Sequence, residues 1–156
     1  MRSLSQSGVL LASAVLITIC SVPARASNFD DKIPDQQSID ALEARAIQAQ
    51  PRDQCFLYTE LIHEMTEFSL RNYAAGDVDK ATSLLKRVQL LSHKLHLSIS
   101  NDDKRLKNAE ILLRHTAFRL TEMLHSSSFE DRPLVEATLL QVNKAQSDAM
   151  LHVFSK

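Results

Sequence analysis

Glycine is almost absent from this chain of 156 residues, and its absence limits the folds that the chain can adopt. The sequence holds two glycines, Gly8 near its start and Gly76 near its middle. Folds rich in β-strands need many tight turns, and glycine is the residue that most often allows them. Phosphate-binding loops, dinucleotide-binding motifs and nucleophile elbows also depend on glycine. We therefore expect an all-α fold, and we exclude the enzyme classes that are built on those motifs.

The first 26 residues have the pattern of a secretory signal peptide. A charged tip precedes an apolar run over residues 9–20, and an Ala-x-Ala end closes the segment at Ala26. This pattern predicts cleavage after Ala26 and a periplasmic or secreted protein. The alternative is a lipoprotein with its lipid on Cys20, but Ile19 stands where that processing needs a small side chain. The run is too short for a membrane anchor, so we expect no membrane-spanning segment after cleavage.

The chain is mildly acidic once these residues are removed. Cleavage takes away Arg2 and Arg25 and no acidic residue, which leaves 16 Lys and Arg against 19 Asp and Glu, a net charge of −3. Nucleic-acid-binding domains usually carry a basic face, so we expect no nucleic acid as a partner. Hydrophobic residues make up 44% and charged residues 24% of the chain, which is a globular composition.

Apolar residues recur every three or four positions over five segments, which is the helical period. The expected helices cover residues 36–48, 52–74, 78–98, 102–125 and 132–154, after a flexible lead-in over residues 27–35. The last four are similar in length and are joined by short turns. These features favour an up-down-up-down four-helix bundle preceded by a short N-terminal helix, in a single helical domain over residues 36–156. The alternative is an array of helical hairpins, but we find no repeat of the required length.

Capping residues mark several of the expected helix ends. Pro51 ends the first helix, Gly76 closes the second, and Asp77 opens the third. Residues 100–103 resemble a capping box and predict the start of the fourth helix. Asp131 or the residue after it is expected to cap the last helix. The expected inward residues are Ile39, Leu42, Ala46, Ile47, Tyr58, Leu61, Ile62, Met65, Phe68, Val78, Ala81, Leu84, Leu85, Val88, Leu91, Leu95, Ile99, Leu106, Ala109, Leu113, Thr116, Ala117, Leu120, Leu124, Val135, Leu139, Val142, Ala149 and Val153.

Two pairs of residues have a spacing that could hold a metal ion on one side of a helix. His63 and Glu67 are four residues apart, and His93 and His96 are three apart. Two ligands alone make a weak site, and we expect His63 and Glu67 to lie on a solvated acidic face. These four residues are the candidate ligands of an alternative function, a carrier of a metal ion or small ligand. No resident cofactor is expected.

The pattern Glu-x-x-His occurs twice, ending at His63 and at His125. Di-iron carboxylate bundles use two such motifs. In a bundle whose second and fourth helices run in parallel, the two motifs are offset by about 12 residues, or about 18 Å along the helix axis. One pair of metal ions cannot bridge that distance, so we expect no di-iron site.

Cys55 is the one cysteine that remains after cleavage at Ala26. Three roles are open to it: a small apolar residue in the core, an intermolecular disulfide between two copies, and a nucleophile oriented by His152. Packing in the core is the favoured role. Nothing in the sequence combines a nucleophile, a base and a group that stabilises charge, so we expect no enzyme.

Several large apolar residues fall outside the expected inward stripes. Phe56 and Leu70 lie on the shoulder of the second helix, and Ile111 and Phe118 lie seven residues apart on the fourth. Others of this kind are Leu90, Leu97, Leu140, Leu151 and Phe154. A closed bundle needs one stripe per helix, so the first helix, a second copy, a partner protein or an apolar ligand must cover this surplus. We expect Phe56, Leu70, Ile111 and Phe118 to form an interaction surface.

Two tracts carry a resemblance. Residues 51–67, PRDQCFLYTELIHEMTE, and residues 103–110, DKRLKNAE, resemble stretches of short secreted all-helical bacterial proteins with no assigned activity. The resemblance covers most of the chain after residue 26, and it implies the compartment and the helical fold but no site residue. The helical stress chaperones of the periplasm are a second comparison, but their Leu-Thr-x-x-Gln repeat is missing here.

These patterns together predict a periplasmic or secreted, non-enzymatic helical bundle. Its expected activity is contact with a protein partner or with further copies of itself. The alternative remains a carrier that binds a metal ion or small ligand through surface histidines.

Overall fold

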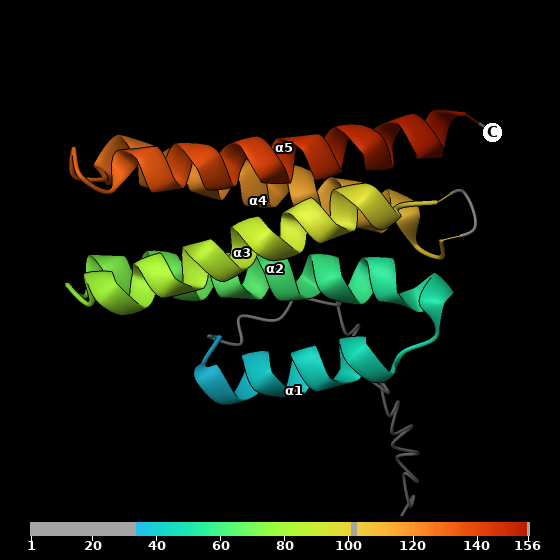
Figure 1. Cartoon of the computed structure of the whole chain (residues 1–156), viewed down its shortest axis with the longest axis horizontal. Coiled ribbons are helices and arrows are strands. Elements are labelled where there is room, and N and C mark those ends of the chain that lie inside the picture. Colours follow the sequence, from blue (N-terminus) through green and yellow to red (C-terminus); the bar gives the residue numbers. More distant parts are fainter. Residues whose placement is uncertain (1–33, 101–102, 156) are drawn as a thin grey trace, which may run out of the picture. The chain divides into compact units, whose positions relative to one another are not determined.

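The structure is a computed structural model, and it describes residues 34–100 and 103–155. This part of the chain contains five α-helices and no strand. They are α1 (Gln36–Gln48), α2 (Pro51–Ala74), α3 (Val78–Ser98), α4 (Leu106–Ser126) and α5 (Arg132–Phe154) (Figure 1). The prediction of an all-α fold is confirmed for these residues. The predicted signal peptide over residues 1–26 and the lead-in up to residue 33 lie outside the described residues.

Side-chain caps and one glycine set the ends of the first three helices. The Asp35 carboxylate accepts a hydrogen bond from the Ser38 N–H at 2.7 Å, and Ser38 Oγ accepts one from the Asp35 N–H at 3.0 Å, which completes a capping box on α1. Gly76, with a φ of +84°, makes the left-handed turn after α2. The Asp77 carboxylate then accepts from the Lys80 N–H at 3.2 Å and begins α3. The predicted roles of Gly76 and Asp77 are therefore confirmed.

The start of α4 differs from the prediction. α4 begins at Leu106, four residues later than expected, and Arg105 before it has a left-handed φ of +59°. Two contacts tie this turn to α2: the Lys104 ammonium lies 3.1 Å from the Asp53 carboxylate, and the Arg105 guanidinium lies 3.5 Å from the centre of the Phe56 ring. These contacts join segments that are far apart in the sequence. They favour a start of α4 at Leu106, which the local capping pattern alone does not predict.

α2 has the most helical neighbours. It packs against α1, α3 and α4, while α5 packs against α3 and α4. The polar contacts from α2 to α4 and to the turn just before α4 join residues 51 to 53 positions apart: Asp53 with Lys104, His63 with Thr116, and Glu67 with Arg119. This nearly constant offset means that α2 and α4 run in the same direction.

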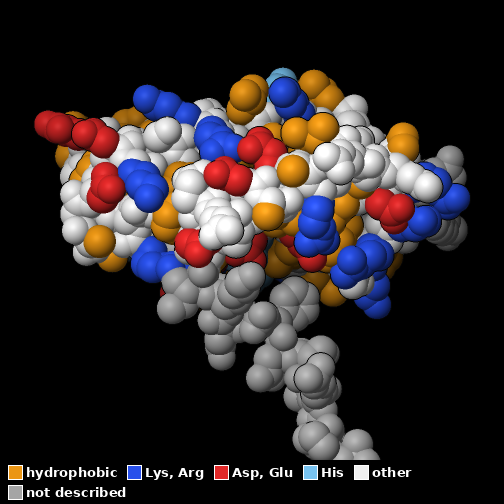
Figure 2. Space-filling view, turned by 90° about the horizontal axis from the view of Figure 1, so that it is seen from below, with side chains coloured by type: hydrophobic (Ala, Val, Ile, Leu, Met, Phe, Trp, Pro, Cys, Tyr) orange, Lys and Arg blue, Asp and Glu red, His pale blue; other side chains and the backbone are white. Residues whose placement is uncertain are grey.

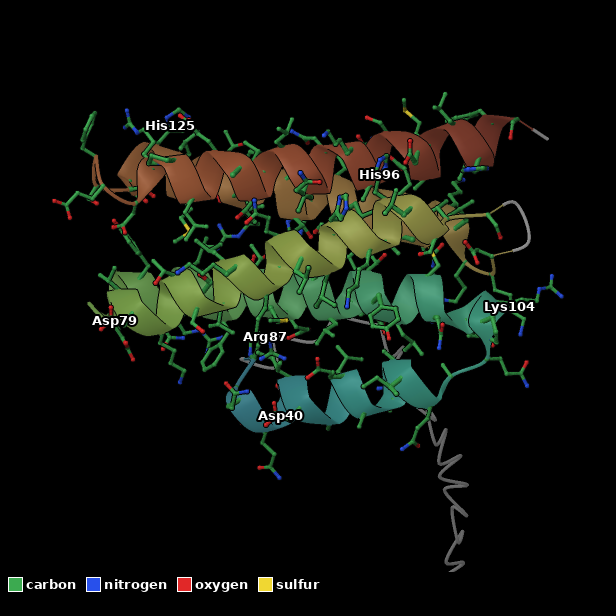
Figure 3. All side chains as sticks on the ribbon, in the orientation of Figure 1. Asp40, Asp79, Arg87, His96, Lys104 and His125 are labelled. Atoms are coloured by element: carbon green, nitrogen blue, oxygen red, sulfur yellow. The ribbon has the colours of Figure 1, made fainter. Side chains whose placement is uncertain are left out.

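α1 covers one side of α2. Its Ile39 and Ala46 are fully buried. Its Glu43 accepts a hydrogen bond from Arg87 of α3 at 2.8 Å, and Figure 3 shows the Arg87 side chain extending from α3 towards α1. α1 is therefore attached by apolar burial on α2 and by one ion pair to α3.

The core is formed mainly by the predicted inward stripes. The predicted residues that are buried are Ile39, Ala46, Leu61, Ile62, Met65, Ala81, Leu84, Leu85, Val88, Leu95, Leu106, Ala109, Leu113, Thr116, Leu120, Val135, Val142 and Ala149. Two predicted inward residues, Ile47 and Val78, are instead exposed, because they lie at or near helix ends beyond the reach of a neighbouring helix. Within the described residues, no helix is both long and apolar enough to cross a membrane.

Candidate functional site

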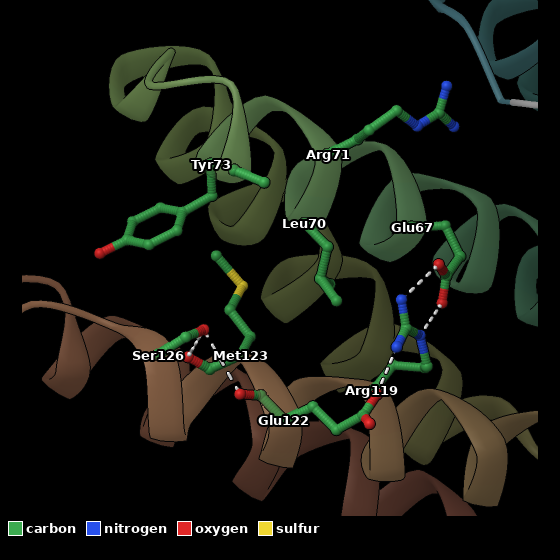
Figure 4. Close-up of a pocket in the computed structure, with 9 residues that line it drawn as sticks. Glu67, Leu70, Arg71, Tyr73, Arg119, Glu122, Met123 and Ser126 are labelled. Carbon is green, nitrogen blue, oxygen red and sulfur yellow. Dashed lines mark hydrogen bonds and ion pairs between the residues drawn. The ribbon is translucent and has the colours of Figure 1, made fainter.

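An ion-pair network joins the second half of α2 to α4. Nε and Nη2 of Arg119 donate to the two carboxylate oxygens of Glu67 at 2.6 and 3.1 Å, and Nη1 donates to the Glu122 carboxylate (Figure 4). The hydrogen bond that Arg119 donates to Glu67 is the main cause of a raised pKa of Arg119. A guanidinium that grips a carboxylate with two nitrogens fixes geometry as well as charge. This network therefore holds the register of α2 against α4.

A groove with a volume of about 660 Å³ lies beside this network, between the C-terminal halves of α2 and α4 (Figure 4). Leu70 and Met123 give it an apolar lining. Polar groups that line it already have partners: Ser126 Oγ donates to the Met123 carbonyl at 3.0 Å, and the Tyr73 hydroxyl donates to Asp131 at 3.0 Å. The groove therefore offers mainly apolar contact.

His63 lies in the same seam, next to the ion-pair network. Its Nδ1 lies 3.0 Å from Thr116 Oγ1, whose own proton is donated to the Leu112 carbonyl at 2.8 Å. Thr116 Oγ1 is thus the acceptor for His63, and Nδ1 of the imidazole carries a proton. The His63 ring also lies 5.2 Å from the ring of His115 on α4. Burial lowers the pKa of His63, and Glu67 partly offsets this effect.

The prediction that His63 and Glu67 lie on a solvated face is wrong. Both side chains are partly buried and face α4, where His63 meets Thr116 and Glu67 meets Arg119. The physical reason is that α4 packs on this side of α2. Glu67 is engaged by Arg119 through both oxygens, so it could join His63 on a metal ion only by giving up that ion pair.

The other histidine pair is also divided between two environments. Nδ1 of His96 lies within hydrogen-bonding distance of the Asp148 carboxylate of α5, and Figure 3 shows His96 at the end of α3 that lies near α5. His93 is exposed, and its ring lies 6.5 Å from that of His96. Across the described residues, no group of three or more His, Cys, Asp or Glu side chains is arranged to hold a metal ion.

Cys55 is a free, buried cysteine of the core. Burial, with a smaller contribution from Asp103, raises the pKa of its thiol to about 12. The proposed intermolecular disulfide needs an accessible sulfur, and 5% exposure does not provide one. Burial therefore favours the role in the core over the disulfide.

The four residues of the predicted interaction surface lie in three different environments. Phe56 is buried, because the Arg105 side chain covers its ring, so its predicted place on an exposed surface is wrong. Leu70 is half-buried and lines the groove. Ile111 and Phe118 remain exposed on α4, at 45% and 58%. Of the predicted interaction surface, the part that is exposed in the structure is therefore the outer face of α4 around Ile111 and Phe118.

Further exposed apolar residues lie on the neighbouring helices. They are Leu90 and Leu97 on α3 and Leu140, Met150, Leu151 and Phe154 on α5. Met150 is an addition to the outward residues expected from the sequence. Each helix of the α3–α5 segment thus has apolar side chains on its outer face.

Three basic residues in and just before α4 lie close to acids. Lys104, in the turn before α4, pairs with Asp53, Arg114 lies 3.9 Å from Glu110, and Arg119 pairs with Glu67. On the face shown in Figure 2, Lys and Arg side chains lie among Asp and Glu side chains and hydrophobic ones rather than in one basic patch. This arrangement agrees with a salt-bridged, solvated surface.

Comparison with known proteins yields no relative: no family model, curated protein or solved structure matches the chain.

Proposed function

We propose that the protein is a secreted or periplasmic, non-enzymatic helical bundle that acts by binding other proteins. In this proposal α2–α5 form an up-down-up-down four-helix bundle, and α1 lies alongside it. The parallel course of α2 and α4, and the packing of α5 against both α3 and α4, support this arrangement. The Ala-x-Ala pattern at Ala26 supports the proposed compartment.

The observation that carries the proposal is the exposure of large apolar side chains at helical spacing. Ile111 and Phe118 lie seven residues apart on α4, and Leu90 and Leu97 lie seven apart on α3. A spacing of seven places two residues on nearly the same side of a helix, so each pair forms a short apolar strip. Covering one such side chain contributes about 1.5–3 kcal/mol. Because these side chains are already partly covered, a pair supplies only part of the free energy that association requires, and the partner must also contact neighbouring residues of the same face.

Site-directed photo-cross-linking tests this proposal in the cells that make the protein. A photoreactive phenylalanine analogue replaces Phe118 in one variant and Asn108, an exposed polar residue of the same helix, in the control. We expect light to produce covalent adducts with protein at position 118 and few at position 108. A protein that stays unlinked at position 118 would contradict binding through this face.

The proposed compartment has its own test. N-terminal sequencing and mass measurement of the processed protein should place the first residue at Ser27. A lipid-modified protein that begins at Cys20 would instead support the lipoprotein alternative, and a chain that keeps residues 1–26 would contradict secretion by this route.

A further inference from the structure

Basic residues outnumber acidic ones along most of α3 and α5, although the chain as a whole is acidic. Residues 80–100 and 137–154 hold five Lys and Arg residues and a single acid, Asp148, out of the 19 acids of the chain. The carboxylate of Asp148 lies within hydrogen-bonding distance of His96 in the seam between the two helices. Three of the lysines are exposed: Lys86, Lys94 and Lys144. The outer sides of α3 and α5 are therefore positive, with no exposed acid among these residues.

Large apolar side chains stand on the same outer sides. On α5, Leu140, Lys144, Leu151 and Phe154 follow one another at steps of four, seven and three, which keeps them on one side of the helix. Leu97 of α3 is 71% exposed, and Leu151 and Phe154 of α5 are 64% and 78% exposed. Side chains that are exposed to this extent protrude from the surface and do not line a hollow.

The two outer sides join into one face along the seam between α3 and α5. His96, near the end of α3, meets Asp148 in the last third of α5, and Figure 1 shows the C-terminal ends of both helices at the same end of the bundle. Lys144 and Leu151 lie four residues before and three residues after Asp148, so both stand beside the seam. Leu97 directly follows His96. Lysines and protruding apolar side chains therefore gather towards one end of a shared face.

We propose that this α3–α5 face docks on the surface of an anionic lipid bilayer. The face consists of Lys94, Leu97, Leu140, Lys144, Leu151 and Phe154. Lysines beside exposed Leu and Phe side chains are typical of helices that lie at the boundary between lipid headgroups and acyl chains. The apolar side chains enter the lipid, and each lysine extends its aliphatic stem along them and places its ammonium group among the phosphates. This inference goes beyond the proposed function, and it leaves the α4 face to a protein partner.

Charge favours the bilayer over the other occupants of this face. A second copy that packed the same face against it would bring Lys94 and Lys144 close to the same lysines, and like charges repel. An anionic bilayer instead offers negative charge over the whole face, and each lysine near its surface strengthens binding about five-fold. A fluid lipid layer also encloses protruding side chains without needing a preformed hollow for each of them.

Flotation with vesicles tests the electrostatic part of the proposal. The protein should bind vesicles made of equal parts phosphatidylglycerol and phosphatidylcholine at about 0.1 M salt, and it should bind much less at about 0.5 M salt or to phosphatidylcholine alone. The double variant Lys94→Glu/Lys144→Glu should bind at least about 25-fold more weakly. Its matched control, Lys107→Glu/Arg114→Glu, makes the same change in net charge on α4, where both residues are exposed, and should bind nearly as well as the wild type.

Tryptophan fluorescence tests which face enters the lipid. The chain has no tryptophan, so a single substitution reports on one position. With the anionic vesicles, the emission of Phe154→Trp should shift to shorter wavelength. Phe118→Trp, on α4 and 58% exposed at the native phenylalanine, should keep its emission unchanged. Circular dichroism should show the same helicity in all variants and in the wild type.

Several results would overturn the inference. They are a protein that does not float with anionic vesicles, equal loss of binding in the two double variants, and an equal shift at positions 118 and 154. A photoreactive probe at position 154 that links, in cells, to protein or to a second copy and not to lipid would assign the face to that occupant instead. Cross-linking at position 118 is a separate readout, so this inference and the proposed function can fail independently.

Discussion

Glu67 of α2 and Arg119 of α4 form a two-pronged ion pair, at 2.6 and 3.1 Å, across the seam between two parallel helices. Both side chains are at least two-thirds covered, so solvent screens the pair only in part. The pair lies between the His63–Thr116 hydrogen bond and the groove lined by Leu70 and Met123. The seam between α2 and α4 is therefore held mainly by polar contacts at its surface and by apolar packing beneath them.

Arg119→Ala should lower the free energy of unfolding by about 1–2 kcal/mol, because it leaves Glu67 partly buried without its cation. Urea unfolding measures the change. In a double-mutant cycle, Glu67→Gln should cost much less in the Arg119→Ala background than in the wild type. Additive effects of the two substitutions would show that the pair does not couple the helices.

The free energy of unfolding should decrease as the pH is lowered through the range in which His63 titrates. Burial holds the pKa of His63 below its ordinary value of 6.5, so the unfolded chain takes up the proton first as the pH falls. The stabilising contribution is therefore complete above pH 6.5 and is lost as the pH falls through 6.5 towards the lower folded pKa. His115 and Arg119 strengthen the effect, since both disfavour a second positive charge beside them.

Thermal unfolding between pH 5 and pH 8 measures this dependence. His63→Gln should flatten the curve in this window, and His125→Gln, at an exposed position near the end of α4, should leave it unchanged. Equal slopes in the wild type and in His63→Gln would assign the pH dependence to other groups.

Two buried serines should respond in opposite directions to substitution by alanine. The Ser92 hydroxyl is fully buried and has no hydrogen-bond partner among the described residues, so Ser92→Ala should raise stability by about 1 kcal/mol. The Ser69 hydroxyl donates to the Ala81 carbonyl between α2 and α3 at 2.9 Å, so Ser69→Ala should lower stability by about 1 kcal/mol. Chemical denaturation of the two variants side by side tests this, and destabilisation of equal size in both would contradict it.

Cys55 should resist thiol reagents in the folded protein. With a pKa of about 12, its thiolate fraction near pH 8 is about one in 10⁴, and the sulfur is buried as well. Labelling should therefore require unfolding and speed up greatly in denaturant. Rapid labelling of the native protein, or a disulfide-linked dimer through Cys55, would place this residue at the surface.

Helix boundaries and core stripes could be predicted from the sequence where local signals act alone. Gly76 and Asp77 form a turn between α2 and α3 whose geometry depends only on adjacent residues. Residues such as Leu61, Val88 and Leu113 repeat at the helical period and are buried as expected. In contrast, the start of α4 depends on contacts of Lys104 and Arg105 with α2, which no local pattern reveals.

The polar seam could not be predicted, because it depends on which helices become neighbours. Periodicity separates an inward side from an outward side, but α2 is covered on three sides, by α1, α3 and α4. His63 and Glu67 therefore looked solvated, and Phe56 looked exposed, until the position of α4 was known. The exposure of Ile111 and Phe118 could be predicted, because both residues lie outside the inward stripe of α4.

Native mass spectrometry of the processed protein, purified from its own cells without added metal, tests the central claim most directly. Binding to other proteins predicts the bare protomer mass in multiples, or the protomer with another protein attached. A protomer that carries a metal ion or small molecule, or one that stays alone at every concentration, would contradict the claim.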